Sequence, residues 1–475
     1  MYQRLKNLSL ACALLFYVAL PINSFAESAE QKRGREAHEQ LSQFTHFYTD
    51  EKVNTYVREI GERLVANSEW PDHPFHFFIV DSPGINAFAI QGGYVYINRG
   101  LLSYLTSEAQ LAAVLAHEIA HVTKRHTARQ TRQRNLGGAA AFIASLATFN
   151  GNLGDAIRLE NQVRVSGFGR EMELEADEFG ATYLYKTGYD PEALIEVLGI
   201  LKDHQTFSTL QARSQGAQAQ TYHGVFSTHP RNDTRLREVI DQAGQLPPGE
   251  AFVGRSEFRD VIEGMVFGEN DNSVKPPGYE RYSSRGLGVT LAYPDSWERS
   301  TKGQTIMLNS DDGIELHINV TKPNDISPSA EELLSIEHQI TKLGKVEGVY
   351  EQDAAERDEA VMGIAEIEEG DKRVALIKLG ENAYFFESQT PSPLSKEADE
   401  HIINVIRSFR RAEQTDFPPS DIKSVAFRRL EPGETFFELA QNKSFGRDTE
   451  DLLRLINGYY PNGEAQPGTW IKLPE

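Results

Sequence analysis

Cysteine is almost absent from this sequence: its 475 residues include one, Cys12, inside an apolar run near the amino terminus. A chain with a single cysteine cannot close an internal disulfide, so no covalent cross-link is expected in the fold. Lipid attachment at Cys12 is not expected either, because most of the apolar run follows this residue. If the run is removed on maturation, the mature chain contains no thiol.

Long apolar runs are also scarce. Arg4 and Lys6 precede one such run at residues 8–22, and a small-x-small sequence ending at Ala26 follows it. This order predicts a secretory signal peptide, residues 1–26. An uncleaved membrane anchor is the alternative, but this run is short for a bilayer that needs about 20 residues. We therefore expect no integral membrane segment after cleavage and a periplasmic location.

Positive charge is in short supply, since 48 lysines and arginines face 69 aspartates and glutamates, for a net charge of −21. Loss of Arg4 and Lys6 with the signal takes the charge from −21 to −23. Such an acidic chain repels phosphate backbones and anionic lipids, which excludes nucleic acid as an expected partner. The hydrophobic content of 40% is that of a folded protein, and the length predicts about three domains.

The most informative motif is an H-E-x-x-H sequence that runs from His117 through Glu118 to His121, within residues 111–126, a run with helical character. Residues four apart lie on one face of a helix, so both imidazoles would point to the same side. Two neutral ring nitrogens can then bind one metal ion at about 2.0–2.1 Å, with Glu118 nearby as a general base. The motif predicts one Zn²⁺ per chain, bound by His117 and His121.

A second helix is predicted over residues 170–186, and it carries four acids that could complete the site. Spacing divides them into two faces, Glu171 with Glu175 and Glu173 with Asp177. A catalytic zinc site has three protein ligands and a fourth place for water, and a nearby carboxylate commonly orients a ligand imidazole. Glu173 as third ligand and Asp177 as the partner of a histidine would meet both needs from one face. The alternative is that all four acids form a solvated face.

Two short strands are expected just before the metal helix, one at Asn86, Ala87, Phe88 and Ala89 and the next at residues 94–98. An edge strand can hold an extended peptide by adding it to the sheet. The first strand is therefore a candidate for substrate binding. A plain structural hairpin is the alternative.

Two further segments are predicted to be helices. Residues 51–67 place Val53, Val57 and Ile60 at helical spacing. Residues 137–149 are apolar but too short to cross a membrane. For them we favour a core helix over a mobile cover of the active site.

Together, the H-E-x-x-H motif and the run from Glu173 to Asp177 resemble the HtpX-like family of gluzincin metallopeptidases, which also includes the CAAX prenyl proteases. The likeness spans roughly residues 45–240, and Asn86 to Ala89 resemble the family's edge strand. The resemblance implies a zincin-type fold with Glu173 as the third zinc ligand. Because the sequence lacks the transmembrane hairpins of other members, it is similar to the soluble periplasmic branch.

A Thr-His-Pro sequence around His229, with Arg235 six residues later, is also similar to that family. By itself, a histidine before a proline is more often a loop residue. The resemblance implies that His229 lies near the zinc, either as a fourth ligand in a resting state or, with Arg235, as a stabiliser of the oxyanion. His223 is a competitor that lacks the framing proline and arginine.

A proline- and glycine-rich linker at residues 275–278 precedes two further domains. Residues 279–413 are expected to form an accessory α+β domain that loosely resembles PsbP-like domains and shows no cluster of ligands. Within residues 286–297 a strand is predicted to lead into Pro-Asp-Ser-Trp, and residues 306–308 and 313–321 are predicted to add strands. The predicted helices are residues 330–343 and 395–408. Residues 421–475 should have the order β-α-α-β and resemble a LysM module, a fold that binds N-acetylglucosamine chains. A LysM-like fold without affinity for sugar is the alternative.

The expected fold class is therefore α+β and multidomain: a mainly helical zincin-type metallopeptidase domain with a small sheet at residues 27–272, then the accessory domain and the small module. We expect a zinc-dependent endopeptidase of the bacterial cell envelope that cleaves misfolded or unassembled envelope proteins. Peptidoglycan is a further expected partner, through the last module. The alternative is a latent protease that acts mainly as a chaperone or as a peptidoglycan-binding assembly factor.

Overall fold

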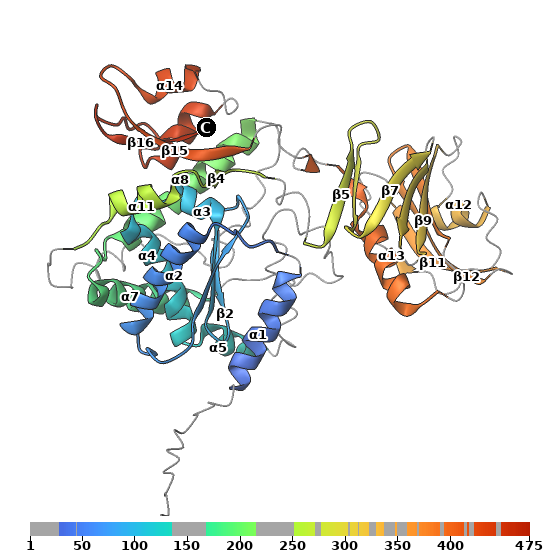
Figure 1. Cartoon of the computed structure of the whole chain (residues 1–475), viewed down its shortest axis with the longest axis horizontal. Coiled ribbons are helices and arrows are strands. Elements are labelled where there is room, and N and C mark those ends of the chain that lie inside the picture. The colour runs from blue at the N-terminus through green and yellow to red at the C-terminus, as the bar shows by residue number, and fades with distance from the viewer. Residues whose placement is uncertain are drawn as a thin grey trace, which may run out of the picture.

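The computed structural model describes residues 28–43, 45–134, 168–214, 251–270, 277–302, 305–311, 313–322, 329–336, 347–348, 359–367, 370–389, 394–412, 416–417, 422–442 and 448–475. The signal peptide, residues 137–149, His223, His229 and Arg235 lie outside these described residues. The fold combines helices with sheets, as expected at that coarse level (Figure 1). Within the described ranges, no helix combines the length and the apolar character that a membrane crossing requires.

A three-stranded sheet organises the amino-terminal part. Its strands are β1 (His76–Val80), β2 (Ala87–Ile90) and β3 (Tyr94–Asn98), in the order β1-β3-β2. β1 runs parallel to β3, whereas β2 runs antiparallel to it and lies at an edge. Because side chains alternate along a strand, the sheet presents two apolar faces.

Helices cover both faces of this sheet. α1 (Ala29–Ser42) covers one face, where Phe88 and Tyr96 pair across β2 and β3 and pack toward it. α2 (Glu51–Ala66) and α4 (Glu108–Thr123) cover the other face, where they pack against the alternate residues of the same strands. Figure 1 shows α1 on the opposite side of the strands from α2 and α4.

The metal helix predicted from sequence is α4, and it is wholly buried. The other helices of the amino-terminal part are α3 (Arg99–Tyr104), α5 (His126–Arg134), α7 (Arg170–Thr187), α8 (Ala193–Ser214) and α11 (Arg255–Ile262). The hydroxyl of Ser107 accepts a hydrogen bond from the Gln110 N–H and so caps the start of α4. A Cβ on Gly180 of α7 would lie 3.3 Å from the His117 backbone nitrogen, so glycine permits the close approach of these two helices.

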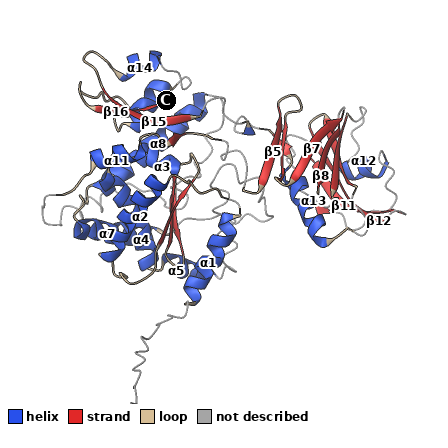
Figure 2. Ribbon diagram, viewed as in Figure 1, coloured by secondary structure: helices blue, strands red, loops and turns tan. Residues whose placement is uncertain are grey.

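The middle part, between residues 277 and 412, has its own sheets (Figure 2). One has the order β10-β11-β12-β13-β9-β8-β7 and the other the order β14-β6-β5. The strands are β5 (Tyr279–Ser284), β6 (Val289–Pro294), β7 (Trp297–Lys302), β8 (Thr305–Ser310), β9 (Glu315–Thr321), β10 (Glu347–Gly348), β11 (Glu359–Ile367), β12 (Gly370–Leu379), β13 (Asn382–Ser388) and β14 (Arg410–Arg411). Helices α12 (Ala330–Ile336) and α13 (Lys396–Ser408) pack on this part.

Several of these elements differ from the sequence expectation. Within residues 286–297, the strand expected to lead into Pro-Asp-Ser-Trp is β6, which starts at Val289 and ends at Pro294, and β7 begins at Trp297. The expected helix at residues 330–343 is described only as far as Ile336. β11, β12 and β13 are absent from the expectation, although they form a large share of the seven-stranded sheet.

The carboxyl-terminal part has the expected order of two strands around two helices. These elements are β15 (Lys423–Arg429), α14 (Phe436–Asn442), α15 (Thr449–Ile456) and β16 (Trp470–Pro474). They do not form a separate sheet, because β15 also pairs with β4 (Val266–Phe267), which follows α11. Val425 of β15 belongs to the same apolar core as the metal helix. The last part of the chain is therefore packed into the amino-terminal part.

Candidate metal centre

Three candidate ligands meet where α4 packs against α7. His117 and His121 lie one turn apart on α4, and Glu173 comes from the first turn of α7. Their ligand atoms all lie within 4.8 Å of one another, and all three residues are buried. Within the part of the chain that the structure describes, this is the one group of histidine and acidic side chains placed to hold a metal ion.

The spacing of the donor atoms fits one zinc ion. The two Nε2 atoms of His117 and His121 lie 3.0 Å apart, and the Glu173 oxygens lie 3.7 and 3.6 Å from them, respectively. Four ligands placed at about 2.0–2.1 Å around zinc are separated by about 3.3–3.4 Å along the edges of the tetrahedron. Two imidazoles and one carboxylate are also a donor set that leaves a place for water. The residues present therefore fit a catalytic zinc.

Asp177 lies against the far side of one candidate ligand. Its Oδ1 is 2.9 Å from Nδ1 of His117, and its side chain has no exposed surface. A carboxylate at this distance favours the tautomer with the proton on Nδ1, which leaves the lone pair of Nε2 for a metal. From one face of α7, Glu173 thus lies near both histidines and Asp177 lies near His117.

Glu118 follows His117 directly on α4. Only 2% of this residue is exposed, so its carboxylate lies away from bulk solvent. This placement suits a group that exchanges protons with a water molecule held in the site.

A histidine that the sequence analysis did not single out also lies at the centre. Nδ1 of His126 is 2.8 Å from Nδ1 of His121, and its Nε2 is 3.2 Å from Oε2 of Glu175. His126 has no exposed surface, and this burial lowers its pKa to about 4, so the ring is neutral near pH 7. Arg129 donates to the same Oε2 of Glu175 at 2.6 Å. Glu175 therefore contacts the His126 ring and is not itself part of the cluster.

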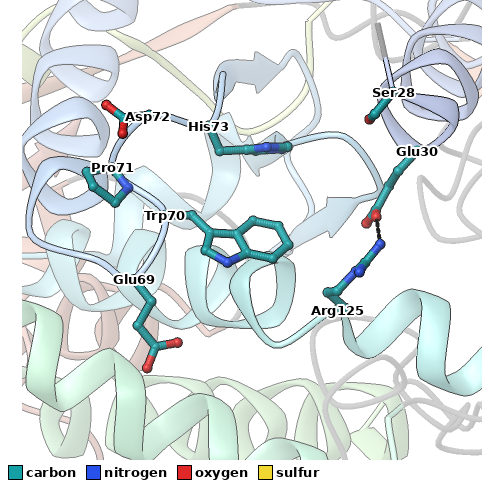
Figure 3. A pocket seen from close by; sticks show the side chains of 8 residues that line it. All are labelled: Ser28, Glu30, Glu69, Trp70, Pro71, Asp72, His73 and Arg125. Atoms are coloured by element: carbon teal, nitrogen blue, oxygen red, sulfur yellow. Dashed lines mark hydrogen bonds and ion pairs between the residues drawn. The ribbon is translucent and has the colours of Figure 1, made fainter.

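The turn after α4 explains why spacing alone did not reveal His126. Arg125 has a φ of 56°, in the left-handed region that side chains rarely adopt, and it redirects the chain into α5. Arg125 forms an ion pair with Glu30 and lies 5.9 Å from the centre of the Trp70 ring. Figure 3 shows that ion pair at the side of a pocket of about 450 Å³, with Trp70 in its middle. None of the three clustered residues lines this pocket.

The candidate substrate strand, β2, is an edge strand of the sheet and contacts α4. Asn86 precedes β2, and its carbonyl accepts a hydrogen bond from the Asn98 N–H at 2.8 Å. Ala87 and Ala89 belong to the core that contains α4, whereas Phe88 belongs to the core under α1. All four of these residues are buried. His229 and Arg235, the candidate oxyanion residues, lie outside the described residues.

The H-E-x-x-H residues on one helix, with a glutamate from a second helix beside the two histidines, are an arrangement typical of zinc metallopeptidases. Sequence comparison shows a likeness to a known family over part of the chain. Residues 51–243 match Peptidase family M48.

The chain is also similar to named proteins. It is 32% identical over 259 residues to the β-barrel assembly-enhancing protease of Yersinia pestis, and this match covers 51% of the chain and 50% of the relative. It is 30% identical over 187 residues to the mitochondrial metalloendopeptidase OMA1 of Schizosaccharomyces pombe, which covers 39% of this chain and 51% of the relative. The chain thus spans about half the length of these curated relatives.

Among solved structures, the solution structure of cyanobacterial PsbP from Synechocystis sp. PCC 6803 matches with a TM-score of 0.23 and 13% identity. The match covers 28% of this chain and 93% of that one.

Proposed function

We propose that this protein is a zinc-dependent endopeptidase of the bacterial cell envelope that hydrolyses misfolded or unassembled envelope proteins. The observation that supports it most directly is the meeting of His117, His121 and Glu173 at distances suited to one zinc ion. The M48 match and relatives named as proteases agree with this activity. Residues 27–272 would form the catalytic domain, with one Zn²⁺ per chain.

The chemistry can be divided among the residues of the chain. Bound zinc would act as a Lewis acid that polarises the scissile carbonyl and lowers the pKa of water. Glu118 takes a proton from the attacking water and delivers it to the nitrogen of the leaving amine. The carboxylate of Asp177, 2.9 Å from Nδ1 of His117, favours a proton on that nitrogen and so the tautomer in which Nε2 can bind a metal. Asn86 to Ala89 would bind the substrate backbone in extended form.

Glu118→Gln tests this proposal. The amide cannot take a proton from water, so the rate of peptide cleavage should fall by about 10²–10⁴-fold while zinc remains bound. Cleavage of casein and the zinc content of the purified protein are the two measurements. Glu178→Gln is the matched control, because Glu178 is an exposed acid on α7. Full casein cleavage by zinc-loaded Glu118→Gln would rule out the proposed role of Glu118.

His229 has two proposed roles that one variant separates. As a fourth zinc ligand it would close the site to water and keep the protease latent. As an oxyanion stabiliser with Arg235, it would lower the barrier to hydrolysis. His229→Ala should raise the cleavage rate in the first case and lower it in the second.

The location follows from the amino-terminal segment. Residues 1–26 are proposed to be a signal peptide that directs the chain to the periplasm, where polypeptides of the envelope are the substrates. The relatives named β-barrel assembly-enhancing protease are consistent with this setting. Mass spectrometry of the amino terminus of the periplasmic protein, which should begin at Glu27, checks the assignment.

Peptidoglycan is a proposed partner through the LysM-like residues 421–475, with residues 279–413 as an accessory domain. Phe437 is an aromatic side chain on α14 that is 53% exposed, as a sugar-stacking residue would be. Deleting the module would be a poor test, because Val425 lies in the core shared with α4. Sedimentation of the full chain with insoluble peptidoglycan, compared with its Phe437→Ala variant, is the better experiment. Equal sedimentation would leave no role for Phe437 in binding the wall.

A further inference from the structure

His126 has no part in the reaction proposed above, although it is fully buried against a candidate ligand. Its ring centroid lies 4.8 Å from that of His121, and the two rings are inclined by 75°. On another side of His121, Phe168 stacks on the ring at 4.2 Å between centroids. The His121 ring is thus confined by two neighbours. We propose that His126 is a positioning residue that fixes the tautomer and orientation of His121, with Glu175 as its anchor, an inference that rests on the proposed zinc centre.

In the group of His121, His126 and Glu175, the position of one ring proton determines the position of the next. His121 directs Nε2 toward His117 and Glu173, so this nitrogen must keep its lone pair for the metal. In the neutral ring the proton is then on Nδ1, which donates to Nδ1 of His126 at 2.8 Å. His126 accepts there and must carry its own proton on Nε2. That atom lies 3.2 Å from Oε2 of Glu175, a carboxylate that can only accept.

The two ligand histidines are therefore oriented in different ways. His117 contacts the carboxylate of Asp177 directly at 2.9 Å. For His121 the carboxylate is one neutral imidazole further away, and Arg129 also donates to it. This carboxylate is thus farther from His121 than Asp177 is from His117. His126 therefore acts mainly by holding the His121 ring in place. Loss of His126 should then weaken metal binding even though no ligand is removed.

Zinc affinity of the full chain, measured by competition with a chromophoric chelator, tests this inference. His126→Phe keeps a planar ring but removes the acceptor, and it should weaken zinc binding about 10- to 100-fold. His126→Asn places an oxygen near the lost Nδ1 and should recover part of that affinity. Glu175→Gln should cause a smaller loss, and it should add nothing in the His126→Phe background because the two act through one path. Glu178→Gln, an exposed change on the same helix, should match the wild type.

A spectroscopic measurement separates positioning from packing. In the cobalt-substituted protein, the exchangeable Nδ1 proton of His121 should give a shifted, slowly exchanging NMR signal that His126→Phe abolishes. Equal losses in His126→Phe and His126→Asn, with no effect of Glu175→Gln, would show packing alone and overturn the inference. Unchanged zinc affinity in all three variants would overturn it while leaving the zinc centre intact. A wild-type protein that binds no stoichiometric zinc would instead refute the proposed function itself.

Discussion

Nδ1 of His117 and Oδ1 of Asp177 lie 2.9 Å apart, and the carboxylate comes from the same face of α7 as Glu173. One helix therefore supplies both a candidate ligand and the partner of another ligand. A shift of α7 along its axis would disturb both contacts at once. The close approach at Gly180, one turn further along, keeps α7 against the backbone of His117.

Asp177→Asn should weaken zinc binding by about tenfold or more, because the amide is neutral and can present an N–H to His117 in place of an acceptor. Competition with a chelator measures the change. Glu171→Gln is the control, since this exposed acid lies in the first turn of the same helix but on its other acidic face. Wild-type affinity in Asp177→Asn would show that the contact does not orient His117.

Removal of the metal should lower the thermal stability of the amino-terminal part. A ligand that binds only the folded state stabilises it by about 4 kcal/mol when present at a thousand times its dissociation constant. Chelation should therefore lower the melting temperature, and added zinc should restore it. His121→Ala removes a candidate ligand, so its melting temperature should respond to neither treatment. A wild-type melting temperature that ignores chelation would argue against a bound metal.

The sequence was sufficient for those parts of the site that follow helical spacing. His117 with His121, and Glu173 with Asp177, are each four residues apart and meet across two packed helices. His126 could not be found in this way, because it lies five residues after His121 and beyond a left-handed turn. The conformation of that turn depends on partners distant in sequence, among them Glu30. Such long-range contacts leave no periodic signal.

The missed strands have a different explanation. Tyr384 and Phe386 of β13 pack in one core, whereas Ala383 and Phe385 pack in another. With both faces buried, β13 has no polar alternation that would identify it as a strand. The pairing of β15 with β4 could not be predicted from the sequence either. These strands are far apart along the chain, and packing sets their register.

A buried ion pair fixes the segment that carries β4. Arg99 donates to Asp81 at 2.6 Å and to the carbonyls of Val266 and Gly268 at 2.7 and 3.0 Å, and neither charged side chain is more than 3% exposed. Asp81→Ala leaves the guanidinium buried without its counter-ion. The free energy of unfolding should fall by about 3–5 kcal/mol.

Hydrogen exchange of the amides in β1 and β3 measures that change within the amino-terminal part alone. Glu39→Gln removes one partner of the exposed Arg35 pair and should have almost no effect, because solvent screens such pairs. Similar exchange in both variants would mean that the buried pair contributes no more than an exposed one.

Lys472 joins the last strand to the end of α3. Its Nζ donates to the carbonyls of Ser103 and Leu105, each at 2.6 Å, and the residue is 2% exposed. A neutral amine has two N–H groups, which is enough for these two acceptors. Burial lowers the pKa of Lys472 from its ordinary 10.5 to about 7.

This shift predicts how stability depends on pH. Between pH 7 and 10.5 the unfolded chain holds a proton on Lys472 that the folded chain has lost, so the free energy of unfolding rises with pH over this window. Below pH 7 both states are protonated, and above pH 10.5 neither is, so the contribution becomes constant at both ends. The slope should approach about 1.4 kcal/mol per pH unit in the middle of the window.

Comparison with Lys472→Met isolates this effect, because all other titrating groups are common to both proteins. The free energy of unfolding of the wild type, minus that of Lys472→Met, should increase from pH 7.5 to pH 9.5 by roughly 2–3 kcal/mol. Lys186→Met, at an exposed position on α7, controls for the loss of a lysine at the surface. A difference that stays constant across the window would mean that Lys472 remains charged in the folded protein. In that case the two carbonyls at the end of α3 stabilise the ammonium more than burial destabilises it.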